Sequence, residues 1–143
     1  VEGYIVKGKK EARLIAGGGR PKNAPQGWFV EPTVFTDVTN DAIISREEIF
    51  GPVLSIIPYE DEGEAISLAN DSQFGLGGTV WSADNEHALK VAQQVHCGTV
   101  GINGYIPSIG APFGGVKGSG IGRELGPEAV DNYQSLKSTY IMN

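Results

Sequence analysis

Cys97 is the one side chain in this sequence that could act as a sulfur nucleophile, because the chain has a single cysteine. Residues 85–96 before it have the apolar spacing of a helix, so Cys97 is expected at a helix C-terminus. The negative pole of a helix there disfavours the reactive thiolate, and adjacent His96 is the only base beside it in the sequence. We therefore interpret Cys97 as a small structural side chain.

The sequence is also poor in metal ligands. A single cysteine excludes an internal disulfide and any cysteine-based metal cluster. The two histidines, His87 and His96, are too few for a zinc site and are expected on a helix surface. A lone free cysteine is typical of a reducing compartment, which predicts a cytoplasmic location.

Glycine is concentrated in one segment, with nine glycines among the 26 residues 101–126. The phosphate-binding spacing G-x-G-x-x-G is not met, because after Gly118 and Gly120 the third position is Arg123. Lys117 and Gly118 do not form the G-K-[ST] of a P-loop either. A nucleotide-phosphate binding module is thus the weakest hypothesis, and the alternative is tight backbone packing. A long loop of this kind is typical of functional segments.

Carboxylates occur in two groups. Glu47 and Glu48 directly precede Ile-Phe-Gly-Pro, and taken alone they are a solvated pair in a loop. The acidic residues within 60–64 stand at the start of an expected helix, where its positive pole accounts for them.

The elements that must position these residues follow a regular order from residue 53. Residue patterns predict strands at 53–59, 78–81 and 99–103, and helices at 61–70 and 85–96. Asp61 and Asp84 can cap the two helices. Strands separated by helices imply right-handed crossovers and a parallel sheet. The predicted fold class is α/β, with a parallel β-α-β-α-β core.

The remaining segments complete this outline. We expect a helix within 4–13 and a strand at 14–16. Residues 28–35 are expected to form either one strand, which Pro32 restricts to a sheet edge, or two short strands. A short helix follows Pro127. The tail, 137–142, alternates like a strand but has no hairpin partner, so it is a candidate for subunit contact.

Charge and length narrow the class of protein further. The 143 residues carry a net charge of -6, which argues against nucleic acid as a partner. The first 22 residues are basic, at +4, and this run is interpreted as a solvated helix face. No apolar run approaches the ~20 residues of a membrane span, and no signal peptide opens the chain.

Four stretches of the sequence together resemble one family. They are 27–34, 47–53, 98–103 and 112–126, with the texts GWFVEPTV, EEIFGPV, GTVGIN and PFGGVKGSGIGRELG. These stretches resemble the successive C-terminal signatures of the NAD(P)-dependent aldehyde dehydrogenases, in the family's order. The likeness corresponds to roughly the last third of the family.

The resemblance implies an enzyme that attacks an aldehyde with a cysteine thiolate, transfers hydride to NAD or NADP, and hydrolyses a thioester with help from a glutamate. Glu48 matches the family residue that accepts hydrogen bonds from the nicotinamide ribose, and Phe50 matches the aromatic beside the nicotinamide. Phe113 matches a position that lines the aldehyde pocket.

The family's nucleophile in Gly-Gln-x-Cys, its general base and its dinucleotide-binding domain have no counterpart in these residues. Cys97 falls where the family commonly has a small residue. We therefore expect residues 1–136 to be the C-terminal part of a catalytic domain, inactive alone, with 137–143 as an oligomerisation tail joining identical subunits. The alternative is a standalone, non-catalytic interaction module with the same fold.

Overall fold

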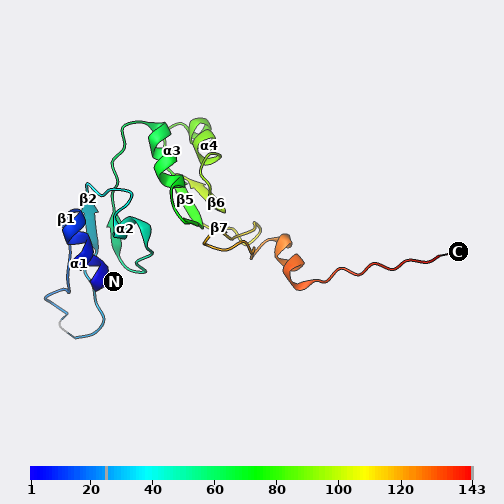
Figure 1. Cartoon of the computed structure of the whole chain (residues 1–143), viewed down its shortest axis with the longest axis horizontal. Helices are drawn as coiled ribbons and strands as arrows, with labels where there is room; N and C mark the ends of the chain where they lie inside the picture. Colours follow the sequence, from blue (N-terminus) through cyan, green and yellow to red (C-terminus); the bar gives the residue numbers. More distant parts are fainter. Residues whose placement is uncertain (25, 143) are drawn as a thin grey trace. The chain divides into compact units, whose positions relative to one another are not determined.

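The computed structural model of the protein describes residues 1–24 and 26–142. The chain forms two compact units, Val1–Asp71 and Ser72–Asn143. Figure 1 shows the order of their elements along the chain.

The first unit is a small mixed sheet with helices. Its elements are α1 (Glu2–Glu11), β1 (Arg13–Ala16), β2 (Thr33–Thr36), α2 (Ile43–Arg46), β3 (Val53–Ser55) and α3 (Glu62–Asn70). Strand β2 is central, antiparallel to β1 and parallel to β3. The expectation of an edge strand at 28–35 is therefore wrong. Pro32 lies just before the strand, and the Thr33 amide donates to Pro52 O at 2.8 Å, so the missing N–H of proline leaves no gap in the ladder.

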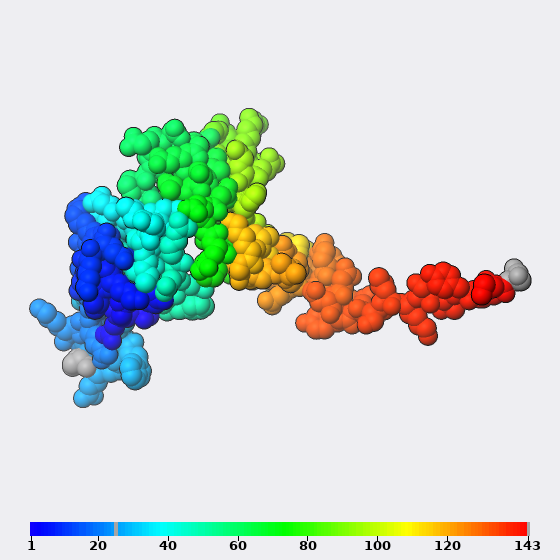
Figure 2. Space-filling view, viewed as in Figure 1, coloured from blue at the N-terminus to red at the C-terminus, as the bar shows by residue number. Residues whose placement is uncertain are grey.

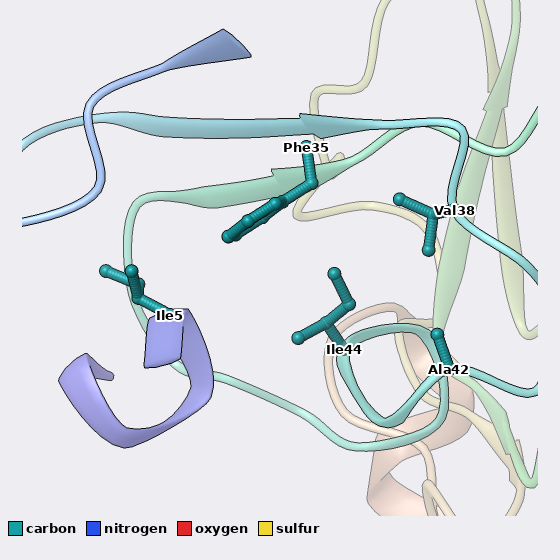
Figure 3. Packing of buried hydrophobic residues seen from close by; sticks show 5 residues of the cluster. All are labelled: Ile5, Phe35, Val38, Ala42 and Ile44. Carbon is teal, nitrogen blue, oxygen red and sulfur yellow. The ribbon is translucent and has the colours of Figure 1, made fainter. Parts of the chain in front are cut away.

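The core of this unit is built around Phe35, which is fully buried. The other buried members of the cluster are Ile5, Val38, Ala42 and Ile44. Figure 3 shows Phe35 projecting from its strand toward Ile5 of α1. Gly8 is required where α1 crosses this ring, because a Cβ there would lie 2.9 Å from Phe35 Cζ. Sheet and helices thus share one apolar centre.

The second unit contains the predicted parallel crossover. Its elements are β4 (Phe74–Gly75), β5 (Gly77–Val80), α4 (Asn85–Ala92), β6 (Thr99–Ile102), β7 (Val116–Lys117) and the 3-10 helix η1 (Pro127–Tyr133). Strands β5 and β6 are parallel and in register from Gly77↔Thr99 to Val80↔Ile102. The glycine-rich segment contributes β7, which pairs antiparallel with β4.

Both predicted helix caps are confirmed. Asp84 Oδ1 accepts from the amides of Glu86 and His87 at 2.9 and 3.0 Å, and Asp61 Oδ1 accepts from the Glu64 amide at 2.8 Å. Each carboxylate therefore satisfies amides that have no partner within the first turn of a helix.

The α/β class is confirmed, but the sheet is divided. Strand β3 pairs with β2, and in the described residues it shares no ladder with β5. The five-element core therefore reduces to β5-α4-β6. Residue patterns identify a strand but do not specify which strand it pairs with. In the structure, β3 pairs in parallel with β2.

The predicted tail strand has no partner within a single chain. In the described part of the chain, residues 134–142 belong to no helix or strand, so the strand at 138–142 is not formed by a single chain. A strand exists only with a hydrogen-bonded neighbour. Residue 143 lies outside the described residues.

Within the part of the chain that the structure describes, no helix has the length and apolar character needed to cross a membrane.

Candidate functional site

The Glu-Glu-Ile-Phe segment starts where α2 ends, so α2 sets its course. This helix has only four residues, too few to be stable alone. Its backbone is held from outside: the Ile43 amide donates to Glu11 Oε2 at 3.0 Å, and Ser55 Oγ donates to Ile44 O at 3.1 Å. Ile44 is also buried in the core. The start of the Glu-Glu-Ile-Phe segment is therefore held in place by α2.

Glu48 and Phe50 both belong to this segment. Glu48 is exposed, and the side chain of Phe50 is 85 % exposed. Phe50 has a φ of 51°, a left-handed conformation that is uncommon outside glycine. An exposed carboxylate can accept hydrogen bonds from ligand hydroxyls, and an exposed ring can cover an apolar ligand face.

Phe113 lies in the second unit at the start of the glycine-rich signature. It forms a two-residue bridge with Glu124, with both backbone N–H···O distances 2.7 Å. Arg123 donates through Nη1 to Gly115 O at 2.7 Å, and Asn132 Nδ2 donates to Arg123 O at 2.6 Å. The segment is therefore a braced turn, anchored to η1, rather than an unstructured loop.

Glycine at two positions allows backbone segments to meet. A Cβ on Gly98 would overlap the carbonyl oxygen of Gly114, and a Cβ on Gly101 would overlap that of Gly104. Strand β6 and the turns beside it can approach this closely only without side chains. The packing interpretation, which concerns the glycines of residues 101–126, is confirmed at Gly101.

Phe113 borders two cavities, of about 350 and 230 Å³. The larger is also lined by Arg123, Glu124, Asn132 and Tyr133. The smaller is lined by Val100, Tyr105, Ile106 and Pro107 among others. Their volumes suit parts of a small organic molecule.

Cys97 is partly buried, and its Sγ donates to the backbone oxygen of Thr99 at 3.2 Å. This contact agrees with a structural role. Among the described residues, no group of three His, Cys, Asp or Glu side chains could hold a metal ion.

The predicted site residues fall into two groups. Glu48 and Phe50 lie together in the first unit, and Phe113 lies in the second. Sequence reasoning missed Tyr4, whose hydroxyl contacts Glu47, and Arg123, which braces the turn around Phe113. No pattern in the sequence signals either contact.

Comparison with known proteins agrees with this geometry. The sequence model described as "Aldehyde dehydrogenase family" matches residues 1–139. The chain belongs to the aldehyde dehydrogenase family.

Among named relatives, the chain is 61 % identical over 142 residues to the geranial dehydrogenase of Castellaniella defragrans, covering 99 % of this chain and 30 % of that protein. It is 49 % identical over 144 residues to the betaine aldehyde dehydrogenase of Rhizobium leguminosarum bv. trifolii, again covering 99 % and 30 %. The chain thus spans about 30 % of the length of these relatives.

Solved structures give the same result. A Mycobacterium tuberculosis aldehyde dehydrogenase complexed with NAD+ superposes with a TM-score of 0.91 at 52 % identity, covering 99 % of this chain and 30 % of that one. An NAD+ complex of an aldehyde dehydrogenase from Bacillus cereus gives 0.92 at 48 % identity, with 98 % and 28 % covered. The predicted family resemblance is confirmed.

Proposed function

We propose that residues 1–136 form the C-terminal part of the catalytic domain of an NAD(P)-dependent aldehyde dehydrogenase, which oxidises an aldehyde to a carboxylic acid. The observation that carries this proposal is the family match over residues 1–139, in a chain 30 % as long as its relatives. The parent enzyme is proposed to act in the cytoplasm, and the free thiol of Cys97 in this part of it supports a reducing compartment.

In this enzyme Glu48 accepts hydrogen bonds from the nicotinamide ribose, and Phe50 packs at the nicotinamide end. Their exposure on a fixed backbone supports both roles. The bound cofactor, NAD or NADP, accepts the hydride that leaves the substrate. Phe113 lines the aldehyde pocket, which the adjoining cavities support.

We expect the 143 residues alone to show no aldehyde oxidation, because they contain no Gly-Gln-x-Cys nucleophile motif. The purified polypeptide would be incubated with NAD+ or NADP+ and a panel of aldehydes, and cofactor reduction followed at 340 nm. The Cys97→Ala variant is the control. Turnover by the original chain that disappears in this variant would identify Cys97 as a nucleophile and contradict the proposal.

The tail is proposed to pair with a second copy of the chain. Several large apolar side chains near the C-terminus are nearly fully exposed: Tyr133, Leu136, Tyr140, Ile141 and Met142. Such a surface, with unpaired backbone groups, is normally covered. Both the exposure and the alternating sequence support a strand that forms on assembly.

Removal of residues 137–143 from the complete enzyme is therefore expected to convert its oligomer into a smaller species. Light scattering measures the mass, and circular dichroism checks that the fold persists. Substitution of Lys137 by Ala, which keeps the apolar tail, is the matched control. An unchanged mass for the truncated protein at equal concentration would show that the tail closes on its own subunit.

A further inference from the structure

Helix α1 contacts both α2 and the start of the Glu-Glu-Ile-Phe-Gly segment that follows it, all within the first unit. Glu11 accepts from the first amide of α2, at Ile43, with a distance of 3.0 Å. Tyr4 Oη donates to Glu47 Oε2 at 2.6 Å, just after α2 ends. Tyr4 and Glu11 are two helical turns apart and share one face of α1. Figure 2 shows α1, in dark blue, packed against the following cyan segment.

A third contact lies beyond Phe50. A Cβ on Gly51 would lie 2.5 Å from Val1 Cγ2, so the backbone at Gly51 fits closely against the side chain of Val1, the residue before α1. Glu48 and Phe50 therefore lie between two contacts, one from α1 to Glu47 and one from Val1, just before α1, to Gly51. These contacts restrain the backbone that carries the two side chains.

Tyr4 is suited to a fixed role in this bracket. Its ring is half-buried against the core, and Lys7 Nζ lies 5.3 Å from the ring centroid. The hydrogen bond to the Glu47 carboxylate raises the pKa of the Tyr4 hydroxyl above its ordinary value. A hydroxyl bonded to a carboxylate gives a short, directional contact.

We propose that Tyr4 is a positioning residue, which acts through Glu47 to hold Glu48 and Phe50 in the conformation that binds the nicotinamide end of the cofactor. This inference rests on the proposed function of Glu48. It assigns Tyr4 no contact with cofactor or substrate.

The test uses the complete enzyme and two independent variants of the contact. Tyr4→Phe keeps the ring and its packing but removes the donor, and Glu47→Ala removes the acceptor from an exposed site. Both are expected to raise the Kd for NAD+ about three- to tenfold, which is less than the loss of a hydrogen bond made directly to the ligand, because this contact is exposed and acts only through the segment. The double variant is expected to match the stronger single variant, because both remove one interaction.

Two further variants separate positioning from general damage. Glu47→Gln keeps an oxygen that can accept from Tyr4, so its Kd is expected to stay within about twofold of the original. Tyr59→Phe changes an exposed tyrosine of the same unit and is expected to leave the Kd for NAD+ unchanged. Amide hydrogen exchange of residues 47–51, measured without cofactor, is expected to accelerate in Tyr4→Phe and Glu47→Ala only.

Unchanged exchange and unchanged Kd in both contact variants would overturn the proposal, as would an equal change in Tyr59→Phe. Faster exchange with an unchanged Kd would overturn it too, because the segment would then be loosened without consequence for binding. If Glu48→Gln leaves NAD+ affinity unchanged, the role of Glu48 is wrong, and the exchange data alone then decide whether Tyr4 holds the segment.

Discussion

Glu48→Gln in the complete enzyme is expected to slow hydride transfer by about one to two powers of ten. The substitution keeps the shape of the side chain but removes the charge that strengthens hydrogen bonds from the ribose hydroxyls. Such a bond contributes roughly 1.5 to 3 kcal/mol, and each ~1.4 kcal/mol corresponds to a factor of ten. Single-turnover formation of NADH, with enzyme in excess over aldehyde, isolates this step.

Glu60→Gln is the matched control, since Glu60 is an exposed carboxylate of the same unit outside the family motif. It is expected to leave the rate unchanged. If Glu48→Gln also leaves both the single-turnover rate and the NAD+ affinity unchanged, Glu48 is simply a solvated loop carboxylate.

Phe35→Ala is expected to lower the free energy of unfolding by about 3 to 5 kcal/mol. The ring is fully buried and packs between the sheet and α1. Gly8 of α1 lies against the ring and has no side chain that could fill the cavity left by the substitution. Urea unfolding of the complete protein, followed by circular dichroism, measures the change.

Phe29→Ala provides the comparison, because this ring is 57 % exposed. Its loss is expected to cost under about 1 kcal/mol, as for other surface substitutions away from a core. Equal effects of the two substitutions would show that Phe35 is not the centre of a packed core.

The local structure of the chain could largely be predicted from sequence. The β5-α4-β6 unit and the caps at Asp61 and Asp84 depend on neighbouring residues, whose patterns are visible in sequence. The partner of β3 could not be predicted, because a parallel neighbour is chosen by three-dimensional packing. The tail strand stays a prediction, since a ladder needs a second strand that this single chain does not provide.

The candidate site was predicted through motifs rather than geometry. Family motifs identified Glu48, Phe50 and Phe113, but nothing in the sequence joined Tyr4 to Glu47, which lie 43 residues apart. Arg123 was likewise seen as an interruption of a glycine spacing, whereas its guanidinium donates to the backbone of that same turn. Long-range polar contacts of this kind have no periodic signature.

The left-handed backbone of Phe50 has a consequence for the energetics of recognition. A non-glycine residue in that region costs about 1 to 3 kcal/mol, which the rest of the first unit must offset whenever the protein is folded. The conformational entropy of this segment is then lost during folding instead of during association, so a ligand meets a preorganised surface. Substitutions that merely loosen the segment should therefore weaken binding without changing any atom that touches the ligand.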